Sequence, residues 1–87
     1  MSISKAERTR RKREKIKRIY QYYLDRLVEV YQIKDYCKIR ETYSSITAFE
    51  KGVRAMCDGG EHTYWHREFN NMFKAIIPKL KEADNDS

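Results

Sequence analysis

The densest group of chemically active side chains is a run of cations near the N-terminus. Residues 1–18 carry nine Lys and Arg against two Glu, a formal charge of +7, whereas residues 19–87 carry ten against eleven acids, a charge of −1. Cationic blocks bind polyanions by displacing counterions from phosphates, and Arg adds forked contacts to phosphates and guanine edges. On a helix these cations are spread around the axis rather than along one side. The candidate binding residues are Arg8, Arg10, Arg11, Lys12, Arg13, Lys15, Lys17 and Arg18.

This basic segment predicts contact with DNA, RNA or a nucleoprotein complex. The alternatives are a solvated helix end and a contact for an acidic protein. A membrane surface fits less well, because the segment lacks the apolar face that an interfacial helix needs. Tyr20, Tyr22 and Tyr23 follow the segment directly, and their rings are suited to stacking on unpaired bases.

The tyrosines form a second group, with seven in 87 residues. Tyr20, Tyr23 and Tyr31 share a helical stripe of apolar residues and are expected in the core. Aromatic side chains away from the stripe are candidates for a protein interface, where Tyr and Trp bury well. The alternative is a half-buried rim of the core. The candidate interface residues are Tyr22, Tyr36, Tyr43 and Trp65.

Cysteine and histidine supply a third group. Cys57, His62 and His66 have C-x4-H-x3-H spacing, and with Cys37 they provide four ligands of the kind that tetrahedral zinc takes. The close cysteine pair usual in zinc modules is absent, and the histidines share a helix face with two phenylalanines. We therefore expect no metal and no other cofactor. A zinc-stabilised structural module is kept as an alternative hypothesis for this chain.

Catalytic constellations are not found. The sequence has no glycine-rich phosphate loop, nucleophile elbow or HExxH motif. Asp25 and Glu29 are an i,i+4 carboxylate pair, but Arg26 between them is typical of a solvated helix face. The residues around His66–Asn71 resemble the site of small nucleases only in composition, without the hairpin. We expect a binding protein rather than an enzyme.

The elements that position these groups are predicted to be helices, because Gly and Pro number only three and one. Ser4 and Glu7 have capping-box spacing and predict a helix start at Ser4. Charge pairs at i,i+4, such as Glu7–Arg11 and Arg10–Glu14, offset part of the cation repulsion. The apolar stripe from Ile16 to Tyr31 then loses phase, which indicates a break near residues 32–35. One continuous helix with several faces is the alternative.

Two more helices are expected beyond this break. One spans Thr47–Asp58, because Thr47 and Glu50 also have capping-box spacing and Gly59 follows. The other spans Glu61–Ile77, where Pro78 ends or kinks it. The predicted core consists of Ile16, Tyr20, Tyr23, Leu27 and Tyr31 against Phe49, Val53, Met56, Trp65, Phe69, Phe73, Ile76 and Ile77.

The sequence thus predicts one all-α domain, a small bundle of three to four helices with a long basic N-terminal helix. Residues 1–18 form a basic arm, 19–80 the bundle and 81–87 a flexible tail. So small a core is marginally stable, so a homodimer or a docked partner is expected. No signal peptide or membrane span is visible, and two isolated cysteines suit a reducing compartment, so we expect the cytoplasm, a nucleoid or a nucleus.

Two functional hypotheses follow from this organisation. The first is a non-enzymatic accessory protein that binds nucleic acid or a nucleoprotein complex through the basic helix. The alternative is an inhibitor or adaptor of the kind that viruses and mobile elements encode. Such a protein would dock by protein contacts on a host nucleic-acid-processing machine, for example a CRISPR effector or a polymerase.

Overall fold

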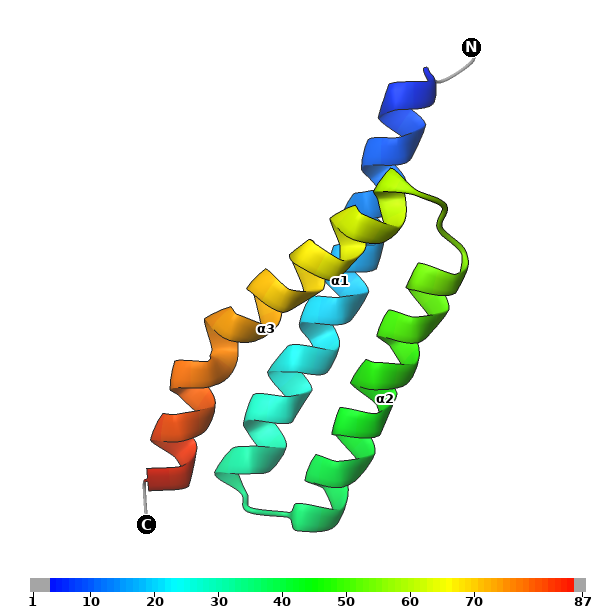
Figure 1. Cartoon of the computed structure of the whole chain (residues 1–87). Helices are drawn as coiled ribbons and strands as arrows, with labels where there is room; N and C mark the ends of the chain where they lie inside the picture. Colours follow the sequence, from blue (N-terminus) through cyan, green and yellow to red (C-terminus); the bar gives the residue numbers. More distant parts are fainter. Residues whose placement is uncertain (1–3, 86–87) are drawn as a thin grey trace.

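A computed structural model describes residues 4–85 and arranges them as three helices, which run down, up and down in Figure 1. The helices are α1 (Lys5–Gln32), α2 (Tyr36–Ala55) and α3 (Gly60–Asn85), and no strand occurs in this range. The predicted all-α bundle is confirmed. Its extents are 54 × 23 × 19 Å, because the first turns of α1 extend past the connection between α2 and α3 (Figure 1).

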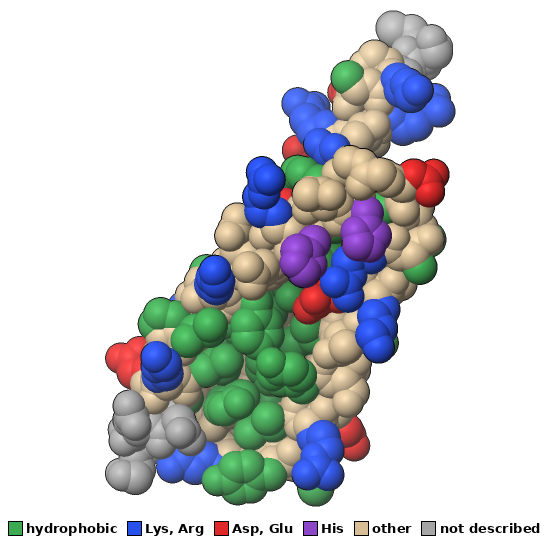
Figure 2. Space-filling view, in the orientation of Figure 1, with side chains coloured by type: hydrophobic (Ala, Val, Ile, Leu, Met, Phe, Trp, Pro, Cys, Tyr) green, Lys and Arg blue, Asp and Glu red, His purple; other side chains and the backbone are tan. Residues whose placement is uncertain are grey.

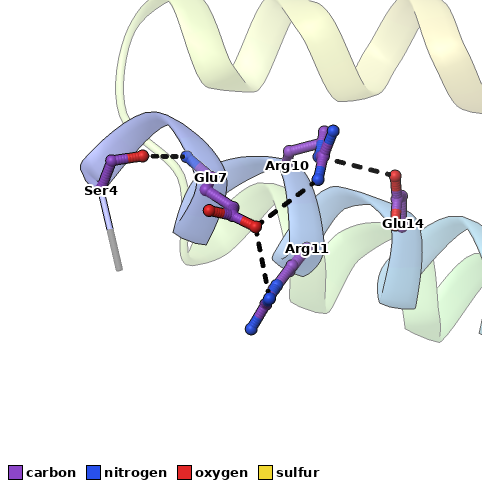
Figure 3. A network of polar contacts seen from close by, with 5 residues as sticks. All are labelled: Ser4, Glu7, Arg10, Arg11 and Glu14. Atoms are coloured by element: carbon purple, nitrogen blue, oxygen red, sulfur yellow. Dashed lines mark hydrogen bonds and ion pairs between the residues drawn. The ribbon is translucent and has the colours of Figure 1, made fainter. Parts of the chain in front are cut away.

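Local hydrogen bonds and ion pairs hold the start of α1 (Figure 3). The Ser4 hydroxyl accepts a hydrogen bond from the Glu7 N–H at 3.2 Å, as the capping spacing predicted. The Glu7 carboxylate pairs with Arg11 at 3.3 Å and with Arg10 at 3.7 Å. Arg10 also lies 3.9 Å from Glu14, so both predicted pairs of this turn are confirmed.

A tight break separates α1 from α2, where the change of phase predicted one. Lys34 has a positive φ of 55°, a conformation that reverses the chain direction after Ile33. Asp35 then caps α2, since its Oδ1 accepts a hydrogen bond from the Lys38 N–H at 3.1 Å. The alternative of one continuous helix is wrong.

Helix α2 begins at Tyr36, so the predicted start at Thr47 is wrong. The Thr47 hydroxyl donates to the Tyr43 carbonyl at 3.0 Å within the helix, and Glu50 accepts from the Tyr20 hydroxyl at 2.9 Å. A Thr-x-x-Glu spacing therefore occurs here in the middle of a helix, where neither side chain caps anything. The sequence signal of the true start was Asp35, which has no partner glutamate three residues later.

Met56 follows the end of α2 and is 71% exposed, so its place in the predicted core is wrong. Its position as the C-cap removes it from the apolar face that Val53 continues. Gly59 takes a φ of 51° in the connection to α3, a conformation that glycine adopts without a steric penalty.

Helix α3 continues through Pro78 to Asn85, so the predicted end near Ile77 is wrong. Proline removes one backbone donor and its ring crowds the preceding turn. The following turn is nevertheless packed, because Leu80 lies against the core and Ala83 is only 9% exposed. Residues 81–85 are helical, and the last part of the predicted flexible tail, 86–87, lies outside the described residues.

All three helices contribute to a single core along the middle of the bundle. Aromatic rings dominate it: the ring centroid of Phe69 lies 4.4 Å from that of Tyr20 and 5.2 Å from that of Trp65. Leu24 and Ile46 are buried although the predicted core did not include them. The buried cluster is Tyr20, Leu24, Leu27, Val30, Ile46, Val53, Trp65, Phe69 and Ile76.

Candidate nucleic-acid interface

Two of the eight candidate cations are turned toward α3. The Arg13 guanidinium donates hydrogen bonds to both carboxylate oxygens of Glu61 and lies 4.0 Å above the Tyr64 ring. Lys17 Nζ lies 3.5 Å from the Glu68 carboxylate and 5.3 Å from the same ring. Both side chains are half-buried. They therefore attach the basic segment to the bundle. Part of the segment 1–18 is thus packed against α3.

The Arg13–Glu61 pair shifts the pKa of both partners toward the charged forms. The hydrogen bond from Arg13 lowers the pKa of the Glu61 carboxyl from its ordinary value, and the same bond raises the pKa of Arg13. Glu61 also belongs to the first turn of α3, where a negative charge complements the helix dipole. Sequence patterns did not identify Glu61, Tyr64 and Glu68, because no local spacing relates them to residues of α1.

Five of the six other candidate cations share one face of α1, and Arg10 lies on a different side of the helix. At 100° per residue, Arg8, Lys12 and Lys15 lie within 60° of arc, and Arg11 and Arg18 adjoin them. This arc lies on the other side of the helix from the buried Tyr20, Leu24 and Leu27. We call the group the cationic face: Arg8, Arg11, Lys12, Lys15 and Arg18, all exposed.

The cationic face is short of counter-charges. Within residues 4–85, Arg11 pairs with Glu7, whereas Arg8, Lys12, Lys15 and Arg18 form no ion pair. Arg10, the eighth candidate, lies between Glu7 and Glu14 (Figure 3). From residue 8 to residue 18 the face is roughly 15 Å long at 1.5 Å per residue. Its geometry suits several neighbouring phosphates.

The tyrosines divide between the core and the surface. Tyr20 is fully buried, and its hydroxyl donates to Glu50 at 2.9 Å. Burial raises the pKa of Tyr20 above its ordinary value of 10, and the hydrogen bond to Glu50 raises it further. Tyr23 and Tyr31 pack against the core, as predicted.

Of the four candidate interface residues, the structure leaves three at the surface. Tyr22, Tyr36 and Tyr43 are 68%, 75% and 46% exposed. Trp65 is 1% exposed because it stacks on Phe69 inside the bundle, so its assignment as a surface anchor is wrong. Trp65 is therefore a core residue.

The four candidate zinc ligands do not meet. Cys37 lies in the first turn of α2 and Cys57 follows its end, so about 20 residues at 1.5 Å each place them roughly 30 Å apart. His66 Nδ1 lies 3.4 Å from the Arg54 guanidinium, a cation rather than another metal ligand. Burial raises the pKa of the Cys57 thiol, which disfavours the metal-binding thiolate. Among the side chains that the structure describes, no three metal-ligating groups cluster, so the predicted zinc ligands are not brought together.

The surface of α1 is thus the strongest candidate site.

None of the helices in the described range combines the length and apolar character needed to cross a bilayer. Comparisons with models of protein families, with curated proteins and with solved structures found no match.

Proposed function

We propose that this protein is a non-enzymatic accessory factor that binds nucleic acid, alone or within a nucleoprotein complex, through the cationic face of α1. The observation that carries the proposal is the sorting of cations. Arg13 and Lys17 pair with acids of α3, whereas four cations on the outer side of α1 have no ion-pair partner in residues 4–85. A partner rich in phosphates supplies the missing negative charge.

The cationic face is also held in place before any partner arrives. It belongs to the same 28-residue helix whose second half is buried in the core. A surface that is already ordered loses little conformational entropy on binding. Phosphate contacts of this kind give affinity without base sequence, and they steer association electrostatically.

One observation favours a second candidate, docking on the acidic surface of a nucleic-acid-processing machine, as an inhibitor or adaptor encoded by a virus or mobile element would do. Tyr22 is 68% exposed and lies one turn beyond Arg18, beside the cationic face. Tyr next to Arg is a common composition of protein interfaces. The salt dependence of oligonucleotide binding separates the two candidates.

The test is a titration of labelled mixed-sequence DNA duplex and single-stranded RNA with the protein at several salt concentrations. Each neutralised phosphate contributes about −0.9 to the slope of log K against log salt on duplex DNA. The triple variant Arg8→Ala, Lys12→Ala, Lys15→Ala should therefore flatten the duplex slope by about 2 to 3. Alanine keeps the helix, which circular dichroism checks.

The matched control removes three exposed cations elsewhere, Lys38, Lys79 and Lys81, and so makes the same change in net charge. It should leave the slope as it is in the wild type, because distant cations release no counterions from the bound strand. Equal losses in the two triple variants would refute a specific face. Absence of binding to both oligonucleotides at low salt would refute the nucleic-acid proposal and favour the protein-docking candidate.

A further inference from the structure

A groove lies between α2 and α3, with α1 behind it. It holds a cleft of about 280 Å³. Tyr20 and Phe69 line its floor, and Tyr43 of α2 meets Phe73 of α3 with ring centroids 5.8 Å apart. Figure 2 shows apolar side chains gathered between these two helices. The same face carries basic side chains (Lys or Arg) and histidines. The cationic face of α1 points away from this groove.

Helix α3 carries its acids and its cations on different sides. Its acids Glu61 and Glu68 turn to α1, where they pair with Arg13 and Lys17. By helical rotation, Arg67 and Lys74 therefore lie on the outer side of α3, and both are exposed.

Helix α2 also carries cations along its outer edge. Arg40 and Lys51 are exposed there, and Arg54 lines the groove itself, where its guanidinium lies 3.4 Å from His66 Nδ1. Glu50 is the one acid among the residues that line the cleft, and it accepts the Tyr20 hydroxyl hydrogen bond. The groove therefore has an aromatic floor and a cationic rim on α2, and beyond His66 and Asn70 the outer side of α3 carries two exposed cations.

We propose that this groove is a docking site for an amphipathic helix of another protein, with an apolar stripe flanked by Asp and Glu. Helix-in-groove recognition places apolar anchors at i, i+3, i+4 and i+7 in such a groove. The acidic flanks would then face Arg40, Lys51 and Arg54 on one side, and the α3 cations on the other. Charge complementarity of this kind sets partner choice and orientation.

Two other occupants fit less well. A second copy packed groove to groove would bring Arg40, Lys51 and Arg54 against the same cations, so like charges would meet. Nucleic acid would place phosphates near the Glu50 carboxylate and over an aromatic floor that has few donors. The inference does not rest on the nucleic-acid proposal, since the two surfaces share no residue.

The experiment uses a synthetic helical peptide with a leucine stripe and glutamates on both flanks, labelled for fluorescence anisotropy. A matched peptide carries lysines in place of the glutamates. The full-length wild type should bind the acidic peptide at least about tenfold more tightly than the basic one. Shifts of amide signals in ¹⁵N spectra should map to residues 43–54 and 66–74.

Two variants test the groove directly. Tyr43→Ser removes a half-exposed ring, Arg54→Glu reverses a rim charge, and each should weaken the acidic peptide by about tenfold. The controls make similar changes at exposed sites outside the groove, Ile33→Ser and Arg26→Glu, and should bind as the wild type does. Melting curves confirm that every variant is folded.

Three outcomes would overturn the inference. The first is equal binding of the two peptides, and the second is wild-type affinity in both groove variants. The third is a shift of the amide signals of the groove residues that is caused by a different occupant. Concentration-dependent shifts of the protein alone would assign the groove to a second copy, and shifts caused by the DNA duplex would assign it to nucleic acid.

Discussion

The two halves of α1 are built on different principles, although they are one helix. Residues 5–18 are held chiefly by charge, through a side-chain cap, pairs within the helix and two ion pairs to α3. The second half is held by packing, since Tyr20, Leu24, Leu27 and Val30 are each at most 1% exposed. Apolar burial supplies most of the free energy of folding, whereas exposed ion pairs supply little.

The contrast shows how one helix can contribute to both folding stability and binding. The buried half fixes the axis and rotation of the helix, and this rotation directs Arg8, Lys12 and Lys15 outward. Substitutions in the second half should then change the free energy of unfolding, and substitutions on the cationic face should change binding alone.

The largest expected effect is on the packed half. Leu27 is fully buried, and Leu27→Ala should lower the free energy of unfolding by about 2–5 kcal/mol through lost burial and the cavity left behind. Lys15→Ala, on the exposed half, should stay within about 0.5 kcal/mol of the wild type. Urea unfolding followed by circular dichroism measures both. Similar losses in the two variants would contradict the division of α1.

A smaller effect is expected from the buried hydroxyl of Tyr20. Tyr20→Phe keeps the ring but removes the hydrogen bond to Glu50, which at neutral pH should lower the free energy of unfolding by about 1–3 kcal/mol. Tyr22→Phe makes the same deletion on a 68% exposed ring and should be neutral. Equal effects of the two variants would show that the hydrogen bond contributes nothing.

The Tyr20 variant also predicts a pH dependence. Burial and Glu50 raise the pKa of Tyr20 in the folded state, so the folded protein holds this proton more tightly than the unfolded chain does. The resulting stability is complete below the unfolded pKa near 10 and is lost as pH rises above it. The stability gap between the wild type and Tyr20→Phe should therefore shrink above pH 10, as urea unfolding across pH will show.

What the sequence predicts well is local. The helical class, the stripe from Ile16 to Tyr31, the Ser4 cap and the break before Asp35 each depend on neighbours within about four residues, which is the range of helical side-chain contacts. The start of α2 was missed for the same reason, because a local Thr-x-x-Glu pattern competed with the single Asp35 cap.

What the sequence does not predict is tertiary. Pro78 is tolerated because residues beyond it pack on the core, and Trp65 is core rather than interface because of where α3 crosses α1. Which cations of α1 are neutralised depends on Glu61 and Glu68 of α3, and Glu61 is 48 residues from Arg13. No local pattern shows which cations a distant acid will neutralise, and the candidate site depends on that.

The smallest expected effect lies at the junction of the two halves, in the Arg13–Glu61 pair. Arg13 lowers the pKa of Glu61 in the folded state, so the folded protein binds this proton less tightly than the unfolded chain. The stabilisation is present above the unfolded pKa of about 4.3 and is lost as pH falls through the folded pKa. Glu61→Gln should lower the melting temperature slightly at neutral pH.

The same variant should match the wild type in acid, because a protonated Glu61 and a glutamine are then nearly equivalent partners for Arg13. Glu14→Gln is the matched control, since Glu14 pairs only within α1, at 3.9 Å from Arg10, and both side chains are more than 60% exposed. Its effect should be smaller at neutral pH, because an exposed pair within one helix contributes little. Thermal unfolding of the three proteins at neutral and acid pH measures this. A gap between Glu61→Gln and the wild type that persists in acid would mean that packing rather than charge joins the basic half to the bundle.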